Sequence, residues 1–221
     1  MAPSANVAVS GLSERKRQAI QAAGTAVFLR RGFEAASMDL IAAEAKVSKQ
    51  TIYNHFHSKD ELFKAIITDM TTALVVPLSM AEAAASTPRQ LLQSFARDFL
   101  KLMLQPSSLA LHRLIVAESA RFPELGAAIY AAGAGRLIRM LADYLEWETK
   151  RGRLAVEDSE RAAEMLIGML TGRMQLRALL GDAKSLTDAE LERRAMVAVS
   201  SFLTLCAPDH DEAVHRTVEI R

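Results

Sequence analysis

The chain has 221 residues, enough for one or two domains with a buried core. Half of the residues are hydrophobic, and the single cysteine, Cys206, excludes an internal disulfide or a thiolate metal cluster. The net charge of +1 is not that of a generic nucleic-acid binder, but its distribution is uneven. Residues 1–60 contain eight Lys and Arg against five Asp and Glu, a net charge of +3, and the rest carries −2. Any phosphate-binding surface is therefore expected in residues 1–60.

Good helix formers dominate the composition, Gly and Pro number only 10 and 6, and no segment alternates in the manner of a strand. The sequence thus predicts an all-α fold. The N-terminus has no basic segment followed by a long apolar core, so no signal peptide is expected. No apolar run was found to reach the roughly 18 residues of a membrane span, so no membrane partner is expected and the single cysteine fits a reducing cytoplasm.

Apolar periodicity and start and stop signals divide the chain into about nine helices. They are predicted, in chain order, at 13–31, 38–45, 49–56, 58–75, 88–105, 107–120, 123–150, 157–180 and 187–206. Residues 1–12 are expected to be a disordered tail, with Ser13 as the first N-cap, and residues 208–221 a loose tail. Between these tails we expect two domains, at 13–60 and 61–207, joined by the continuous helix at 58–75.

The two short helices at 38–45 and 49–56 are joined by a tight turn and are predicted to lock together through apolar residues, namely Leu40, Ile41, Ala45, Val47, Ile52 and Phe56. Ile52 and Phe56 are four apart and share one face of their helix. The opposite face then presents Lys49, Gln50, Tyr53 and Asn54. A helix of this kind fits the major groove of DNA. Periodicity alone leaves a plain helix pair with solvated polar residues equally open.

Residues 14–67 resemble the DNA-binding domain of the TetR (tetracycline-repressor-like) family of transcription regulators. The resemblance is carried, in order, by Ile20, Phe28, Arg31-Gly32-Phe33, Ser37, Ile41-Ala42, Val47-Ser48-Lys49, Thr51-Ile52-Tyr53, Phe56 and Ser58-Lys59-Asp60-Glu61-Leu62. It implies a three-helix, helix-turn-helix domain. One departure is Lys46, which stands where the family usually has Gly; if that residue is left-handed, it costs about 1 kcal/mol.

The predicted contacts with double-stranded operator DNA fall into two groups. The resemblance implies phosphate contacts by Ser37, Lys49, Tyr53, His55 and Lys59. It implies base contacts by Gln50, Thr51 and Asn54. Ser48 begins a helix whose N-terminus favours phosphate, and Lys46 adds charge nearby.

Residues 112–125, with Tyr144-Leu145 and Arg151-Gly152-Arg153-Leu154, resemble the AefR-like C-terminal subgroup, which implies a helical domain for ligand binding and dimerisation. An interface of two helices from each copy is expected at Met165, Gly168, Gly172, Leu191, Ala195, Ala198 and Phe202. The alternative is that both apolar stripes pack on their own subunit.

A small-molecule effector, not identified by the sequence, is expected to contact apolar and polar residues of the same region. The candidates are Phe99, Met103, His112, Ile115, Glu118, Met140, Tyr144, Met169 and Arg173. Stripes of Met and aromatic residues at helical spacing are more often core than pocket, and this reading stays open for each of them.

The sequence therefore predicts a dimeric regulator, with repression as the commoner behaviour in the family, that binds a palindromic operator and is released by its effector. No cofactor and no metal are expected. An enzyme is disfavoured because the five histidines have no metal-ligand spacing and no phosphate-binding loop stands out. A helical protein–protein adaptor of the same fold is the alternative; Lys49, Tyr53, His55 and Lys59 argue against it.

Overall fold

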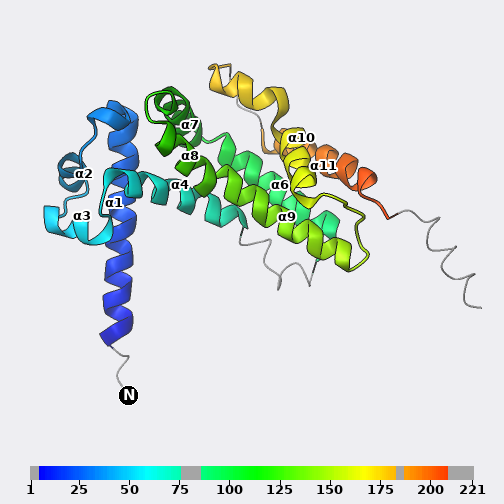
Figure 1. Ribbon diagram of the computed structural model, residues 1–221, viewed down its shortest axis with the longest axis horizontal. Helices are drawn as coiled ribbons and strands as arrows, with labels where there is room; N and C mark the ends of the chain where they lie inside the picture. The colour runs from blue at the N-terminus through cyan, green and yellow to red at the C-terminus, as the bar shows by residue number, and fades with distance from the viewer. Residues whose placement is uncertain (1–4, 76–85, 183–186, 209–221) are drawn as a thin grey trace, which may run out of the picture. The chain divides into compact units, whose positions relative to one another are not determined.

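The computed structural model describes residues 5–75, 86–182 and 187–208, and every regular element in these ranges is a helix (Figure 1). The predicted all-α fold is confirmed. The helices are α1 (Ala5–Ala35), α2 (Met38–Glu44), α3 (Lys49–His55), α4 (Lys59–Val75), α6 (Pro88–Met103), α7 (Pro106–Ser119), α8 (Pro123–Ala132), α9 (Ala134–Lys150), α10 (Ser159–Leu179) and α11 (Asp188–Leu205). The predicted tail lies outside the described residues from position 209 onward.

The chain divides into two compact units. Unit 1 combines Met1–Met70 with Ala110–Gly133, and unit 2 combines Thr71–Leu109 with Ala134–Arg221. The predicted helix at 58–75 is the continuous helix α4, and the division falls within it.

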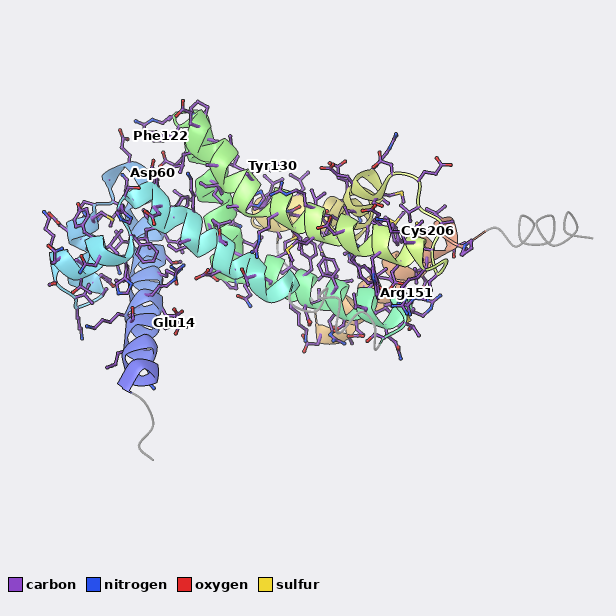
Figure 2. All side chains as sticks on the ribbon, turned by 60° about the horizontal axis from the view of Figure 1, so that its bottom comes forward. Glu14, Asp60, Phe122, Tyr130, Arg151 and Cys206 are labelled. Carbon is purple, nitrogen blue, oxygen red and sulfur yellow. The ribbon has the colours of Figure 1, made fainter. Side chains whose placement is uncertain are left out.

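The core of unit 1 is built around stacked and tilted aromatic rings. The ring centroids of Phe28 and Phe63 are 4.8 Å apart, and those of Phe33 and Phe63 are 5.4 Å apart. Phe122, in the turn between α7 and α8, places its ring 5.7 Å from that of Phe33 (Figure 2). Such aromatic pairs add about 0.5–1.5 kcal/mol each to the burial of their surface. Residues from both ends of unit 1's sequence therefore share one core.

The first helix begins earlier than the sequence predicts. Helix α1 starts at Ala5, so Ser13 is not its N-cap, and the expected disordered tail at 1–12 is wrong from Ala5 onward. A helix that is already nucleated extends at little cost, because each added residue gains one hydrogen bond. The Ser and Gly at positions 10 and 11 each cost at most about 1 kcal/mol, which is too little to stop the helix.

Serine side chains cap the N-termini of α2, α3 and α4. The side-chain oxygens of Ser37, Ser48 and Ser58 accept hydrogen bonds from the amides three residues further on, at 3.2, 3.1 and 3.1 Å. Ser58 with Glu61 three residues further on has the spacing of a capping box, but Glu61 accepts its hydrogen bond from the amide of His57, at 3.0 Å. The N-terminus of each of these helices is therefore fixed by the side chain of its N-cap serine.

Two predicted helices are interrupted at glycines. The helix expected at 123–150 is broken at Gly133 into α8 and α9, and a Cβ atom there would lie 2.9 Å from Cγ2 of Ile67. Helix α10 is broken at Gly172, whose φ of 43° favours glycine. Arg194 of α11 fills the break by donating hydrogen bonds to the carbonyls of Leu170 (2.7 Å) and Thr171 (3.3 Å). Sequence periodicity does not show these breaks, because the apolar spacing continues across them.

Unit 2 has its own core, formed by α6, α9, α10 and α11. A buried ion pair closes the end of α9, where Glu148 is fully buried and both its oxygens meet Arg153, at 2.5 and 2.6 Å. Arg153 also donates to the carbonyl of Ser86 at 3.1 Å. The adjacent turn is tied to the end of α11 by a hydrogen bond from the amide of Ala155 to the carbonyl of Cys206, at the end of unit 2 where Figure 2 labels that cysteine.

One stretch of the described residues, Pro123–Lys150, is long and apolar enough by composition to cross a membrane, with a mean hydropathy of 1.2 over 18 residues. The sequence analysis did not identify it. Its second half is α9, which contributes Leu137, Leu141 and Leu145 to the core of unit 2. The burial of these side chains accounts for the apolar composition of α9.

Removal of the positive partner in the buried pair is expected to be costly. In Arg153→Met, Glu148 would be left as an uncompensated buried charge, and we expect the free energy of unfolding to fall by about 3 kcal/mol or more. The matched control is Lys150→Met, which breaks the exposed pair with Glu146, and it should leave stability unchanged within error. Urea denaturation of both variants measures this, and equal stabilities would contradict the assignment.

Candidate nucleic-acid interface

Helices α2 and α3 are the two short helices beside α1 (Figure 1). Their shared apolar side is buried as predicted at Ile41, Ile52 and Phe56, which are exposed by 1% or less. Leu40 is an exception, since 41% of the residue is exposed and it does not belong to the apolar core that joins the two helices. An amphipathic helix of seven residues has only one way to bury both Ile52 and Phe56, so this packing also determines which side of α3 faces outward.

The outward side of α3 carries the predicted DNA-reading residues. Lys49, Gln50, Tyr53 and Asn54 are all exposed. The side-chain amide of Gln50 donates to Asn54 Oδ1 at 2.9 Å. Thr51 is half-buried and its hydroxyl lies 2.8 Å from that of Ser48, while Ser37 begins α2. The structure thus brings the predicted base and phosphate contacts of α3 together on one hydrophilic surface.

The charges around α3 are partly paired, which the sequence analysis did not anticipate. Lys49 Nζ lies 3.0 Å from the carboxylate of Asp39 on α2, and that hydrogen bond and charge raise the pKa of the lysine. Arg30 and Glu44 form a second exposed pair at 2.6 Å. A spacing of ten residues between Lys49 and Asp39 gives no local signal, because the two side chains meet only when α2 and α3 pack.

Lys46 occupies the turn between the two helices in a left-handed conformation, with φ of 55°. The position where the family usually has glycine is therefore left-handed in this chain, and Lys46 carries the strain that glycine would avoid. The side chain of Lys46 is exposed, so its charge is held at the surface next to the N-terminus of α3.

Lys59 has a different environment from the one the sequence suggests. Its ammonium donates hydrogen bonds to the carbonyls of Phe33, Glu34 and Ala36, at 2.7, 3.1 and 3.1 Å. It also lies 4.4 Å from the centre of the Phe33 ring, and its partial burial lowers its pKa. An ammonium has three N–H donors, so Lys59 has none left for a phosphate in this conformation. His55, predicted with it, is half-buried, with its ring 6.4 Å from that of Phe56.

The predicted effector contacts are divided between the two units. In unit 1, His112 is exposed as a whole residue, and partial desolvation of its imidazole by the surrounding protein lowers its pKa. Ile115 is half-buried, and Glu118 accepts a hydrogen bond from the amide of Phe33. Glu118 is therefore engaged by the protein's own backbone. In unit 2, the predicted contacts Phe99, Met103, Met140 and Met169 are partly buried against the core, Tyr144 is buried and Arg173 is exposed.

Burial and the neighbouring carboxylate of Glu148 raise the pKa of Tyr144, so its phenol stays neutral beside the buried ion pair. A groove of about 670 Å³ in unit 2 runs along α10 and α11, and Met169 is one of its lining residues. The other lining residues are Met174, Arg177, Glu190, Arg193, Arg194, Val197, Ala198 and Ser201.

The predicted dimer residues also separate into two groups. Leu191, Ala195, Ala198 and Phe202 are buried in the core of their own subunit, so the alternative stated above holds for α11. Apolar spacing identifies a buried stripe but not the chain that covers it, which is why the prediction was wrong there. The other three, Met165, Gly168 and Gly172, lie on the exposed side of α10. Exposed apolar residues accompany them, namely Leu176, Leu180, Met196 and Val197.

Two family models match this chain. Residues 20–66, which contain α2 and α3, match the bacterial regulatory proteins of the tetR family. Residues 90–207 match the C-terminal domain of AefR-like transcriptional repressors. The chain belongs to the TetR family of bacterial transcriptional regulators. The resemblance identified from the sequence is confirmed, and α2 and α3 are the helix-turn-helix of this TetR-family chain.

Two solved structures and one curated relative agree with this assignment. A TetR-family transcriptional regulator from Mesorhizobium loti MAFF303099 is 32% identical, with a TM-score of 0.74 over 88% of this chain and 98% of that one. The flavonoid-responsive regulator FrrA is 33% identical, with a TM-score of 0.70 over 89% and 99%. The transcriptional activator FasR of Mycolicibacterium smegmatis is 40% identical over 86 residues, 39% of each chain. The chain thus spans less than half the length of this curated relative.

Replacement of Lys46 by glycine should stabilise this TetR-family domain. Glycine adopts positive φ without strain, so in Lys46→Gly we expect the free energy of unfolding to rise by up to about 1 kcal/mol. Lys46→Ala keeps the strain and removes the charge, and should bring no such gain. Thermal unfolding of the two variants separates strain from charge, and equal melting temperatures would contradict strain at this position.

Proposed function

We propose that this chain is a ligand-responsive transcriptional repressor that binds a palindromic operator as a homodimer and is released by a small-molecule effector. The observation that carries the proposal is the outward side of α3. Lys49, Gln50, Tyr53 and Asn54 are exposed there, while Ile52 on the same helix is fully buried. The family match at 20–66 makes this side of α3 the candidate surface for DNA.

The side chains of α3 suit different parts of the duplex. The amide of Gln50 offers a donor and an acceptor to an adenine edge, and Thr51 offers a methyl group to thymine. Asn54 is hydrogen-bonded to Gln50 at the surface, where an exchange of that bond for a base costs little. Phosphate contacts are assigned to Ser37, Lys46, Ser48, Lys49, Tyr53 and His55, which position the helix without reading sequence.

The Asp39–Lys49 pair gives DNA binding an electrostatic cost. Asp39 is negatively charged and lies at the first turn of α2, beside the lysine that we assign to phosphate. Lys49 would exchange the carboxylate for a phosphate, and both charges are more than half exposed, so the exchange takes place in water. Each phosphate neutralised in this way releases counterions, so binding should weaken steeply with salt.

We infer dimerisation because α3, with seven residues, is too short to make many contacts with DNA by itself. A single reading helix makes few contacts, and two copies separated by one turn of DNA, roughly 34 Å, read a palindrome. We assign the interface to the exposed apolar side of α10 and α11, at Met165, Leu176, Leu180, Met196 and Val197. Large apolar side chains left exposed on two neighbouring helices favour a protein partner. This replaces the buried α11 stripe predicted from the sequence.

The proposals that this chain responds to an effector and that it represses transcription rest on its relatives. The matched C-terminal model is that of AefR-like repressors, and FrrA is described as flavonoid-responsive, whereas FasR is described as an activator. The C-terminal match covers residues 90–207, so it favours repression for this chain. Action on DNA places the protein in the cytoplasm.

A pair of exposed tyrosines tests the DNA-binding surface. A duplex selected from a random library by the wild-type protein is used in mobility shifts at increasing salt. Tyr53→Ala should weaken binding at least about tenfold, through loss of a hydrogen bond to a charged phosphate. Tyr130→Ala, an equal truncation on α8, should bind as the wild type.

Selection of no sequence by the wild-type protein would favour the alternative, an adaptor without DNA binding. Equal losses in both tyrosine variants would instead show that unit 1 is misfolded and would contradict a specific role for Tyr53.

The dimer interface has its own test. Val197 is 60% exposed on α11, and Val197→Glu would place a charge within the proposed interface. We expect it to convert a micromolar dimer into a monomer in sedimentation equilibrium. Val116→Glu, at a residue 63% exposed on α7, should leave the dimer intact. A wild-type monomer would contradict dimerisation, and a dimeric Val197→Glu would contradict this interface.

A further inference from the structure

The segment that forms the end of α7 and α8 is built into the same compact unit as the helix-turn-helix. Residues 110–133 belong to the matched C-terminal domain, yet they form unit 1 together with residues 1–70. Leu111, Leu125 and Ile129 are buried in the core that contains Ile41 and Ile52. Contacts between this segment and the DNA-reading helices are therefore a fixed part of unit 1.

One polar contact in this packing is made by Glu118, near the end of α7. Its Oε1 accepts a hydrogen bond from the backbone amide of Phe33 at 3.2 Å. Gly32, directly before Phe33, has φ of 79°, and a Cβ atom at this glycine would lie 3.2 Å from the same Oε1. Glycine thus serves both the turn that ends the regular part of α1 and the approach of the carboxylate. Glu118 is half-buried, which strengthens the bond relative to one in water.

The connection between α1 and α2 is held from two sides. Lys59 donates to the carbonyls of residues 33, 34 and 36, and Glu118 accepts from the amide of Phe33. An ion pair between Arg121 and Glu34, at 2.6 Å, adds a surface contact. Ser37, which follows Ala36 in the chain, is the N-cap of α2, so the direction in which α2 starts depends on this connection. Helix α3 packs on α2 and follows it.

We propose that Glu118 is a positioning residue for DNA reading, through which the end of α7 holds the α1–α2 connection and sets the orientation of α2 and α3. The inference rests on the proposed function, in which α3 reads the operator. It assigns Glu118 to the protein's own backbone in place of the effector contact predicted from the sequence. A displacement of the end of α7 is then passed to α2 and α3 through the contacts at this connection, of which the hydrogen bond of Glu118 is one.

Three variants test this role. Glu118→Ala removes the acceptor for the Phe33 amide, Glu118→Gln keeps an acceptor oxygen without the charge, and Glu124→Ala removes an exposed carboxylate from the start of α8 as a control. Affinity is measured for a duplex selected from a random library by the wild-type protein and for an unselected duplex. We expect Glu118→Ala to lose about tenfold on the selected duplex, the scale of one hydrogen bond to a charged group, and little on the unselected one. Glu118→Gln should lose less on the selected duplex than Glu118→Ala, because it keeps a neutral acceptor, and Glu124→Ala should bind both duplexes as the wild type.

Hydrogen exchange without DNA supplies a readout that a general loss of stability would not produce. In Glu118→Ala, exchange should become faster at Phe33 and across α2 and α3, and should stay unchanged in α9 and α11. Unchanged affinity for the selected duplex, equal losses in the Ala and Gln variants, or faster exchange throughout the chain would each overturn the proposal. If the wild-type protein selects no duplex, the proposed function fails by itself, and the exchange at Phe33 still decides whether Glu118 holds the connection.

Discussion

The burial of Ile52 and Phe56 in the core of unit 1 is the constraint on which the DNA-reading surface depends. Helix α3 has seven residues, and an isolated helix of that length is not stable in water. Its helical form and its orientation therefore come from packing, not from propensity. Because two apolar side chains four residues apart are buried, the hydrophilic side that carries Gln50 and Tyr53 must face outward. The same burial that stabilises unit 1 thus presents its functional side chains.

Charged side chains in this protein are used repeatedly to satisfy backbone groups where a helix ends or breaks. Lys59 binds three carbonyls after α1, and Arg194 binds two at the break in α10. Arg153, after the end of α9, pairs with Glu148 and also binds the backbone carbonyl of Ser86, just before α6. A polar group that is buried without a partner costs about 1–3 kcal/mol, so these contacts have a stabilising role of their own. Polar residues on apolar helices are for this reason ambiguous in sequence, since structural and functional roles require the same residue types.

The grouping of residues 110–133 with the helix-turn-helix changes how the two family matches relate to the chain. The first boundary between the compact units, after Met70, lies between the two family matches, which end at residue 66 and begin at residue 90. Two more boundaries, near the start of α7 and after Gly133, fall inside the second match and assign residues 110–133 to unit 1. An effector that acts on the end of α7 would act on a part of unit 1. The hydrogen bond from the Phe33 amide to Glu118 is a short route between that segment and α2.

The amino-acid sequence by itself determined what depends on near neighbours in the chain. The all-α class, the start of a helix at Ser48 and the continuous helix α4 follow from local composition and spacing, and all three are observed. Tertiary structure alone decided which groups meet across long separations: Glu118 with Phe33, Lys49 with Asp39, and the α11 stripe with its own core. The physical reason is that apolar spacing specifies that a face is buried, while the partner that covers it is selected only when the helices pack.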